Sequence, residues 1–109
     1  MGDVITIHEL YKIHKEKDKK QIEIFRNITS LINKKIKRIA EAGGFNIFYD
    51  IPPMIVGLPL YNIEECISYV ATIYRKAGFL VQRLPQPNNT VLYISWKVDD
   101  VSTKYKKLY

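Results

Sequence analysis

Residue types that carry catalysis or bind metals are few in this chain and far apart. Cys66 is the only cysteine, which excludes an internal disulfide and a metal site built from several cysteines. His8 and His14 lie six residues apart, and that spacing does not place both rings on one helix face, as a shared metal ion would require. No carboxylates are paired for catalysis, and neither a phosphate-binding glycine loop nor a nucleophile elbow is present. We therefore expect no catalytic, cofactor-binding or metal-binding residues, and a protein that is not an enzyme.

Clustered cations are the feature with the most specific chemistry. They fall off the apolar stripe of a predicted helix and recur near the C-terminus, and phosphate binding needs such clusters within reach of one backbone. The same residues could instead form a solvated helix face that complements the helix dipole. The candidate patch for nucleic acid or an acidic partner comprises Arg26, Lys34, Lys35, Lys37, Arg38, Lys104, Lys106 and Lys107.

The positive charge is concentrated toward the two ends of the chain. The formal net charge is +6, and residues 1–44 carry ten Lys or Arg against six Asp or Glu, whereas residues 45–84 carry three of each. This distribution favours an acidic partner, although solubility alone would also explain it. No apolar run approaches the roughly 18 residues of a membrane helix. We expect a soluble protein of a reducing intracellular compartment.

A long helix should position the basic cluster. Thr6 and Glu9 form a capping box, so a helix is predicted to begin near Ile7. The run HKEKDKK that follows contains no apolar residue, and we expect the helix to weaken or break around residues 15–20. Beyond it, one buried face is predicted at helical spacing, and Gly43-Gly44 should end the helix. That face comprises Phe25, Ile28, Ile32, Ile36 and Ile39.

An alternating strand is predicted over residues 45–51, and Pro52-Pro53 should stop it. The connection MIVGLPLY at 54–61 is too apolar to remain exposed to solvent, so it either packs over the core or binds a partner. We favour packing, because a small domain needs all the apolar burial it can obtain. The alternative makes the loop, together with a hairpin tryptophan, a protein interface. Its candidate residues are Met54, Ile55, Val56, Leu58 and Trp96.

A second helix and a hairpin complete the predicted elements. Asn62 and Glu65 cap a helix that runs to about Ala77 and points Cys66 inward. Strands are predicted over residues 79–84 and 90–96, with Leu92, Ile94 and Trp96 on the core side. A short terminal helix, capped by Asp99 or Asp100, would place Val101, Tyr105 and Leu108 on one side.

These elements predict one α+β domain of order α-β-α-β-β. A three-stranded antiparallel sheet packed against two helices is the simplest arrangement, and it is similar to a reduced winged helix. We assign residues 1–20 to a charged, partly helical extension, residues 21–96 to the domain, and residues 97–109 to a basic tail.

A series of short motifs runs through the predicted domain. They are YDIPP at 49–53, GLPLY at 57–61, the helix with Cys66 and Tyr69, AGF at 77–79 followed by Val81, and ISW at 94–96. In this order and spacing the chain resembles a group of short, functionally uncharacterised proteins encoded by nucleocytoplasmic large DNA viruses. The resemblance implies a virion or infected-cell cytoplasm as the location. It carries over no catalytic or binding residue.

Two functions fit these expectations. The first is a non-enzymatic structural or assembly protein, a minor virion-associated component that binds larger proteins through apolar anchors. The alternative is a winged-helix-like nucleic-acid-binding protein that uses the basic patches of the first helix and tail. Glu64 and Glu65 count against the alternative, because they open the helix that would have to approach phosphates. The oligomeric state is left open.

Overall fold

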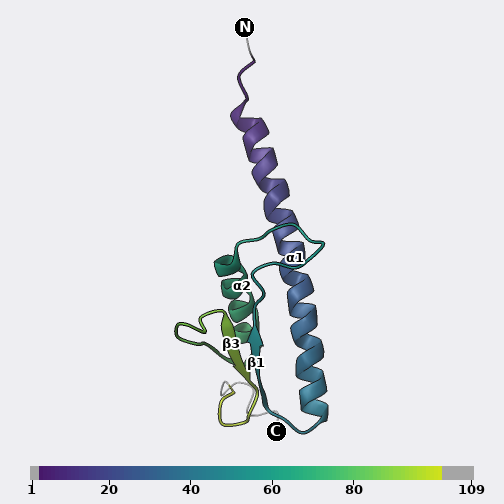
Figure 1. The fold of residues 1–109 in the computed structure, drawn as a ribbon, viewed down its shortest axis with the longest axis vertical. Coiled ribbons are helices and arrows are strands. Elements are labelled where there is room, and N and C mark those ends of the chain that lie inside the picture. Colours follow the sequence, from purple (N-terminus) through teal and green to yellow (C-terminus); the bar gives the residue numbers. More distant parts are fainter. Residues whose placement is uncertain (1–2, 102–109) are drawn as a thin grey trace.

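The computed structural model describes residues 3–101, which form two helices and a three-stranded sheet (Figure 1). The strands are antiparallel, and β3 lies between β1 and β2. The predicted α+β class and the order α-β-α-β-β are confirmed. In chain order the elements are α1 (Ile7–Glu41), β1 (Asn46–Asp50), α2 (Ile63–Lys76), β2 (Leu80–Arg83) and β3 (Val91–Ser95).

Helix α1 is a single helix of 35 residues. The backbone N–H of Glu9 donates to Thr6 Oγ1 at 3.1 Å, so the predicted cap is confirmed. The predicted break around residues 15–20 is wrong. That run lacks apolar residues, but Lys and Glu are good helix formers and the run contains neither Gly nor Pro, so the backbone has no reason to leave the helix. Gly43 ends the helix with a φ of +93°, as expected of a glycine beyond a helix C-terminus.

The hydrophobic core lies between the two helices and one face of the sheet. Three residues of the predicted α1 stripe, Phe25, Ile28 and Ile32, are buried, and its last two, Ile36 and Ile39, are partly buried against the core. Ile24 is buried although the stripe did not include it. Cys66 faces inward, and Leu92 and Ile94 of β3 are fully buried. The hydroxyl of Tyr74 joins the helices by donating to Asn33 Oδ1 and to the Thr29 carbonyl. The buried residues are Ile24, Phe25, Ile28, Ile32, Ile47, Ile51, Cys66, Ile67, Val70, Ala71, Tyr74, Val81, Leu92 and Ile94.

Strand register separates a buried sheet face from an open one. Directly paired residues share a face, and Ile47, Ile94 and Val81 pair across the three strands as the buried row. The neighbouring row, on the opposite face, is Phe48, Tyr93 and Gln82. Both helices therefore cover one face only, and we call the opposite one the outer face.

The N-terminal part of α1 projects beyond the rest of the molecule, as Figure 1 shows. Every side chain from residue 7 to residue 20 is exposed, including the large apolar ones of Ile7, Tyr11 and Ile13. The molecule accordingly measures 69 × 29 × 26 Å. We call residues 7–20 the projecting segment.

After β3 the chain makes a turn in which the N–H of Asp100 donates to the Lys97 carbonyl at 2.8 Å. The Asp100 carboxylate also accepts a hydrogen bond of 2.7 Å from the buried Ser95 hydroxyl. Most of the predicted terminal helix, with Tyr105 and Leu108, lies outside the described residues.

Candidate functional site

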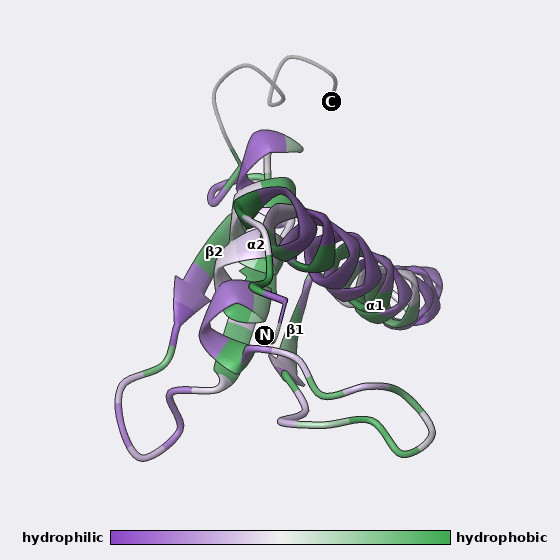
Figure 2. Ribbon diagram, turned by 90° about the horizontal axis from the view of Figure 1, so that it is seen from above, coloured by the Kyte–Doolittle hydropathy of each residue, from purple (hydrophilic) through white to green (hydrophobic). Residues whose placement is uncertain are grey.

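The connection between β1 and α2, residues 52–61, is an exposed apolar loop. Val56 is 94% exposed, Leu60 76% and Met54 56%, so the preference for packing over the core is wrong for these residues. The core face of the sheet is already covered by the two helices, and these three side chains are not part of the core. Figure 2 shows the loop, coloured largely as hydrophobic, standing out from the helices.

Both ends of this loop are fastened to the domain. The Tyr61 hydroxyl donates to the Pro52 carbonyl, and the Tyr61 ring meets Phe25 of α1 edge-on at 6.0 Å. Within the loop the N–H of Leu58 donates to the Ile55 carbonyl at 3.1 Å, and Gly57 between them has a φ of +88°. The side chain of Ile55 packs against the core. The exposed apolar residues therefore sit on a fixed turn.

Trp96 is not part of the same surface. It lies beyond β3, where its N–H donates to the Phe45 carbonyl at 2.9 Å, and its ring packs edge-on against Phe79 at 6.3 Å. Phe45 precedes β1 and the loop follows β1, so Trp96 and the loop lie at opposite ends of that strand. The structure thus brings Met54, Val56 and Leu58 together but leaves Trp96 apart from them and half-buried.

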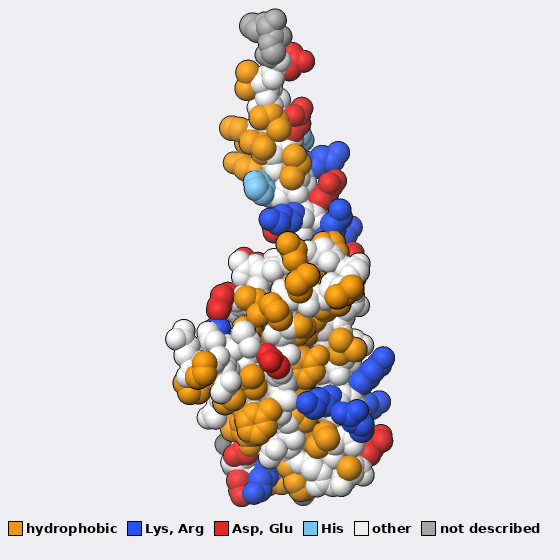
Figure 3. All heavy atoms as spheres, viewed as in Figure 1, with side chains coloured by type: hydrophobic (Ala, Val, Ile, Leu, Met, Phe, Trp, Pro, Cys, Tyr) orange, Lys and Arg blue, Asp and Glu red, His pale blue; other side chains and the backbone are white. Residues whose placement is uncertain are grey.

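The basic patch lies on α1, where Arg26, Lys34, Lys37 and Arg38 are exposed. Lys35 differs, because it is half-buried and its Nζ donates to the Phe48 carbonyl of β1 at 2.9 Å. The same Nζ lies 5.7 Å from the centre of the Tyr49 ring. Figure 3 shows Lys and Arg side chains gathered at one edge of the lower half of the molecule. Lys104, Lys106 and Lys107 lie outside the described residues.

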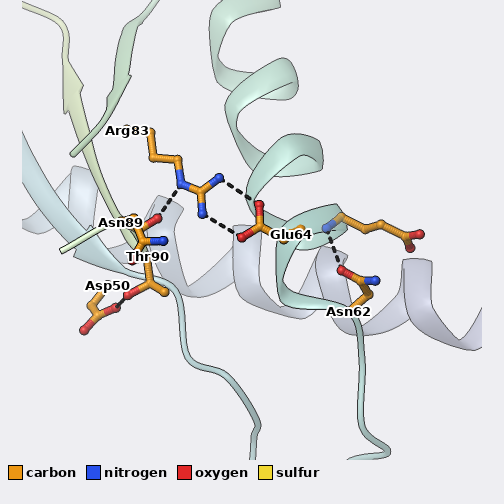
Figure 4. A network of polar contacts seen from close by, with 7 residues as sticks. Asp50, Asn62, Glu64, Arg83, Asn89 and Thr90 are labelled. Carbon is orange, nitrogen blue, oxygen red and sulfur yellow. Dashed lines mark hydrogen bonds and ion pairs between the residues drawn. The ribbon is translucent and has the colours of Figure 1, made fainter. Parts of the chain in front are cut away.

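The two carboxylates that open α2 already have partners within the protein. Glu64 forms an ion pair with Arg83 of β2, with contacts of 2.8 Å to both terminal guanidinium nitrogens (Figure 4). Glu65 accepts a hydrogen bond from the Gln21 side chain of α1, and its N–H donates to Asn62 Oδ1 at 3.1 Å. The hydrogen bond from Arg83 lowers the pKa of Glu64. Both carboxylates are therefore held against neighbouring elements, and Arg83 balances the charge of Glu64.

The remaining reactive groups have structural surroundings. Cys66 is fully buried, and desolvation raises the pKa of its thiol to about 11, so it is not a thiolate at neutral pH. Within residues 3–101 no group of three or more His, Cys, Asp or Glu side chains is placed to hold a metal ion. Neither of the described helices combines the length and the apolar composition that crossing a bilayer requires.

Sequence reasoning missed an aromatic pair on the outer face. Phe48 of β1 and Tyr93 of β3 lie opposite one another, with ring centres 5.0 Å apart and planes inclined by 45°. Phe48 is 55% exposed. Asn46 and Asp50 lie on the same side of the strand, and these two polar residues indicated a polar side. The signal available in the sequence was a large aromatic residue at a position where the alternation predicts a polar one.

Comparison with known proteins gives one result. A family model described as a family of unknown function (DUF5759) matches residues 5–75, which span α1, β1, the apolar loop and nearly all of α2. No curated protein and no solved structure matches the chain.

Proposed function

The chain belongs to the family of unknown function DUF5759, and because that family brings no activity with it, we propose from the surfaces themselves that the protein is a non-enzymatic assembly protein. It binds larger proteins through the apolar loop between β1 and α2. The observation that carries the proposal is the exposure of Met54, Val56 and Leu60 on a loop whose two ends are fastened.

The energetics of such a loop favour protein binding. Large apolar side chains in water gain free energy when a partner covers them, by roughly 25 cal/mol for each Å² buried. A loop that is already fixed loses little conformational entropy on binding, so more of that gain appears as affinity. A neighbouring partner could also use the projecting segment, where Ile7, Tyr11 and Ile13 are exposed.

The setting that we propose is a virus particle or the cytoplasm of an infected cell. Its support is the resemblance of the YDIPP, GLPLY, AGF and ISW series to short proteins of nucleocytoplasmic large DNA viruses. In that setting the protein is a minor virion component whose partners are larger virion or assembly proteins.

The test is incorporation of a loop variant into particles. Met54→Ser, Val56→Ser and Leu60→Ser are combined in one variant. A control variant combines Leu31→Ser with Val98→Ser, which changes two exposed apolar side chains elsewhere. We expect purified particles to contain the wild type and the control, and to lose the loop variant by about tenfold or more, the effect of roughly 1.4 kcal/mol. Thermal unfolding of each purified protein shows that it is folded.

Two results contradict this proposal separately. Equal recovery of the loop variant and the wild type would show that the loop is not the binding surface. Absence of the wild-type protein from particles would overturn the virion role, whatever the loop binds.

Nucleic-acid binding in the manner of a winged helix is the second candidate. The exposed cations of α1 favour it, since Lys34, Lys37 and Arg38 lie within two turns of one helix. The carboxylates of Glu64 and Glu65 at the start of α2 disfavour groove reading by that helix. Its test measures the affinity for duplex DNA over a salt series. Alanine at Lys34, Lys37 and Arg38 should make that affinity depend less steeply on the salt concentration.

A further inference from the structure

The outer face of the sheet carries two aromatic rings that the fold leaves in contact with solvent. Phe48, Tyr93 and Gln82 form one row across the three strands. Phe48 and Gln82 are exposed and Tyr93 is half-buried. Among residues 3–101, no helix covers this face, because both helices lie on the other one. The row therefore offers two π-faces and one side-chain amide on a rigid support.

Few charges on the outer face would oppose an anionic ligand. The Asp50 carboxylate accepts a hydrogen bond of 2.7 Å from the Thr90 hydroxyl at one end of the face (Figure 4), and Asp100 accepts one from Ser95 at the other. Between them the exposed polar groups are the neutral amides of Asn46 and Gln82. The middle of the face is aromatic and uncharged.

The cation of Lys35 lies at the edge of β1 that faces away from β3. The hydrogen bond from Lys35 to the Phe48 carbonyl fixes one ammonium group beside the Phe48 residue. Arg38 follows Lys35 by three residues on the same helix, which places the two side chains next to one another. Figure 3 shows Lys and Arg side chains beside hydrophobic ones on this half of the molecule. The net charge of +6 adds a long-range attraction for anions.

Aromatic rings beside two neighbouring cations match the chemistry of an unpaired nucleotide strand. Every base has a π-face that stacks on Phe or Tyr, and the phosphates follow the cations. In a duplex these π-faces are hidden within the stack, so duplex cannot use the rings. We propose that the outer face binds single-stranded nucleic acid, with bases stacked on Phe48 and Tyr93 and phosphates held by Lys35 and Arg38. This role is additional to protein assembly and does not depend on it.

The test measures fluorescence anisotropy of labelled oligothymidine and oligouridine of about ten nucleotides, a length within the usual range for one stacking surface. Phe48→Leu and Tyr93→Leu remove a ring and keep an apolar side chain. Phe45→Leu is the matched control, because Phe45 is also exposed but lies on the other face. We expect each outer-face variant to weaken binding about tenfold or more, and the control to bind like the wild type.

Salt and duplex measurements separate stacking from simple charge attraction. The logarithm of the binding constant falls linearly with the logarithm of the salt concentration, and the slope reflects the number of phosphates contacted. Lys35→Gln and Arg38→Gln should each reduce this slope by the amount expected for about one phosphate contact. Duplex of the same length should bind the wild type more weakly than the single strand does. Equal affinity for duplex and single strand, undiminished binding by both leucine variants, or no binding of either oligonucleotide at low salt would each overturn the proposal.

A second measurement guards against a variant that fails to fold. Oligouridine in which bromouridine replaces uridine is irradiated with the wild-type protein, and the crosslinked residues are mapped by mass spectrometry. Crosslinks at Phe48 or Tyr93 support the proposal, and crosslinks confined to other parts of the chain overturn it.

Discussion

The guanidinium of Arg83 on β2 meets the carboxylate of Glu64 in the first turn of α2 through two contacts of 2.8 Å (Figure 4). Two parallel contacts of this kind fix both side chains, and they join the hairpin to the helix that packs behind it. The pair is solvent-accessible, so its contribution to stability is small and depends on salt.

Acid should abolish the contribution of this ion pair to the stability of the fold. The hydrogen bond from Arg83 lowers the pKa of Glu64 below its ordinary value of 4.5, so the unfolded state takes up a proton before the native state does. The stabilisation is therefore present above pH 4.5 and is lost as the pH falls through the lowered pKa. We expect Glu64→Gln to lower the Tm at neutral pH and the difference from wild type to vanish in acid. Glu23→Gln, at another exposed helix position, is the control.

Alkaline pH should destabilise the protein through its buried thiol. Burial raises the pKa of Cys66 from 9.0 to about 11, and that of Tyr74 from 10.0 to about 12. Above pH 9 the unfolded state loses these protons first, so the free energy of unfolding falls as the pH rises from 9 toward 11. Thermal unfolding between pH 7 and pH 11 measures the fall. Cys66→Ala should show a shallower decline, and an equally steep one would contradict the assignment to the thiol.

Substitutions at two adjacent positions of the apolar loop should differ in their effect on stability. Val56→Ser changes a side chain that is 94% exposed, so the free energy of unfolding should stay within about 0.5 kcal/mol of wild type. Ile55→Ser removes a side chain that packs against the core and should cost about 1–2 kcal/mol, below the 2–5 kcal/mol typical of a fully buried isoleucine cut to alanine. Urea unfolding measures both. Similar costs at the two positions would show that the whole loop belongs to the core.

Removing residues 1–18 should leave the domain folded. The side chains of residues 7–20 are all exposed, and Gln21, which binds Asn62 and Glu65, is retained. We expect the helical circular dichroism signal to fall in proportion to the residues removed and the Tm to change little. A large fall in Tm would show that the domain extends into the projecting segment.

Sequence periodicity predicted the elements that bury an apolar face. The stripe through Phe25, Ile28 and Ile32, the inward Cys66 and the core side of β3 all follow from spacing, because burial imposes a period on the residues that it selects. The projecting segment buries nothing, so no apolar period marks residues 15–20. Helix propensity alone keeps that run helical, so a prediction based on apolar spacing wrongly placed a break there.

The candidate surfaces depend on relations that a linear pattern does not carry. The sequence allowed the apolar loop to be interpreted as core or as interface, and only the structure shows that Val56 is exposed while the two helices cover the core. The Phe48–Tyr93 pair joins residues far apart in the chain through the register of β1 and β3. Alternation placed each ring on a face of its own strand, but only the pairing of the strands puts them in contact.

The continuity of α1 has a geometric consequence for whatever the protein joins. A rigid spacer sets both distance and rotation: residues 7–20 hold the tip roughly 20 Å beyond the domain, at 1.5 Å per residue. Inserting two residues into this segment would turn the tip by about 200°, whereas inserting seven would restore its facing to within about 20° and lengthen the reach by about 10 Å. A partner that binds the tip and the domain together should not bind the variant with two inserted residues, because the tip then faces the wrong way. To bind the variant with seven inserted residues, it would have to span a longer distance.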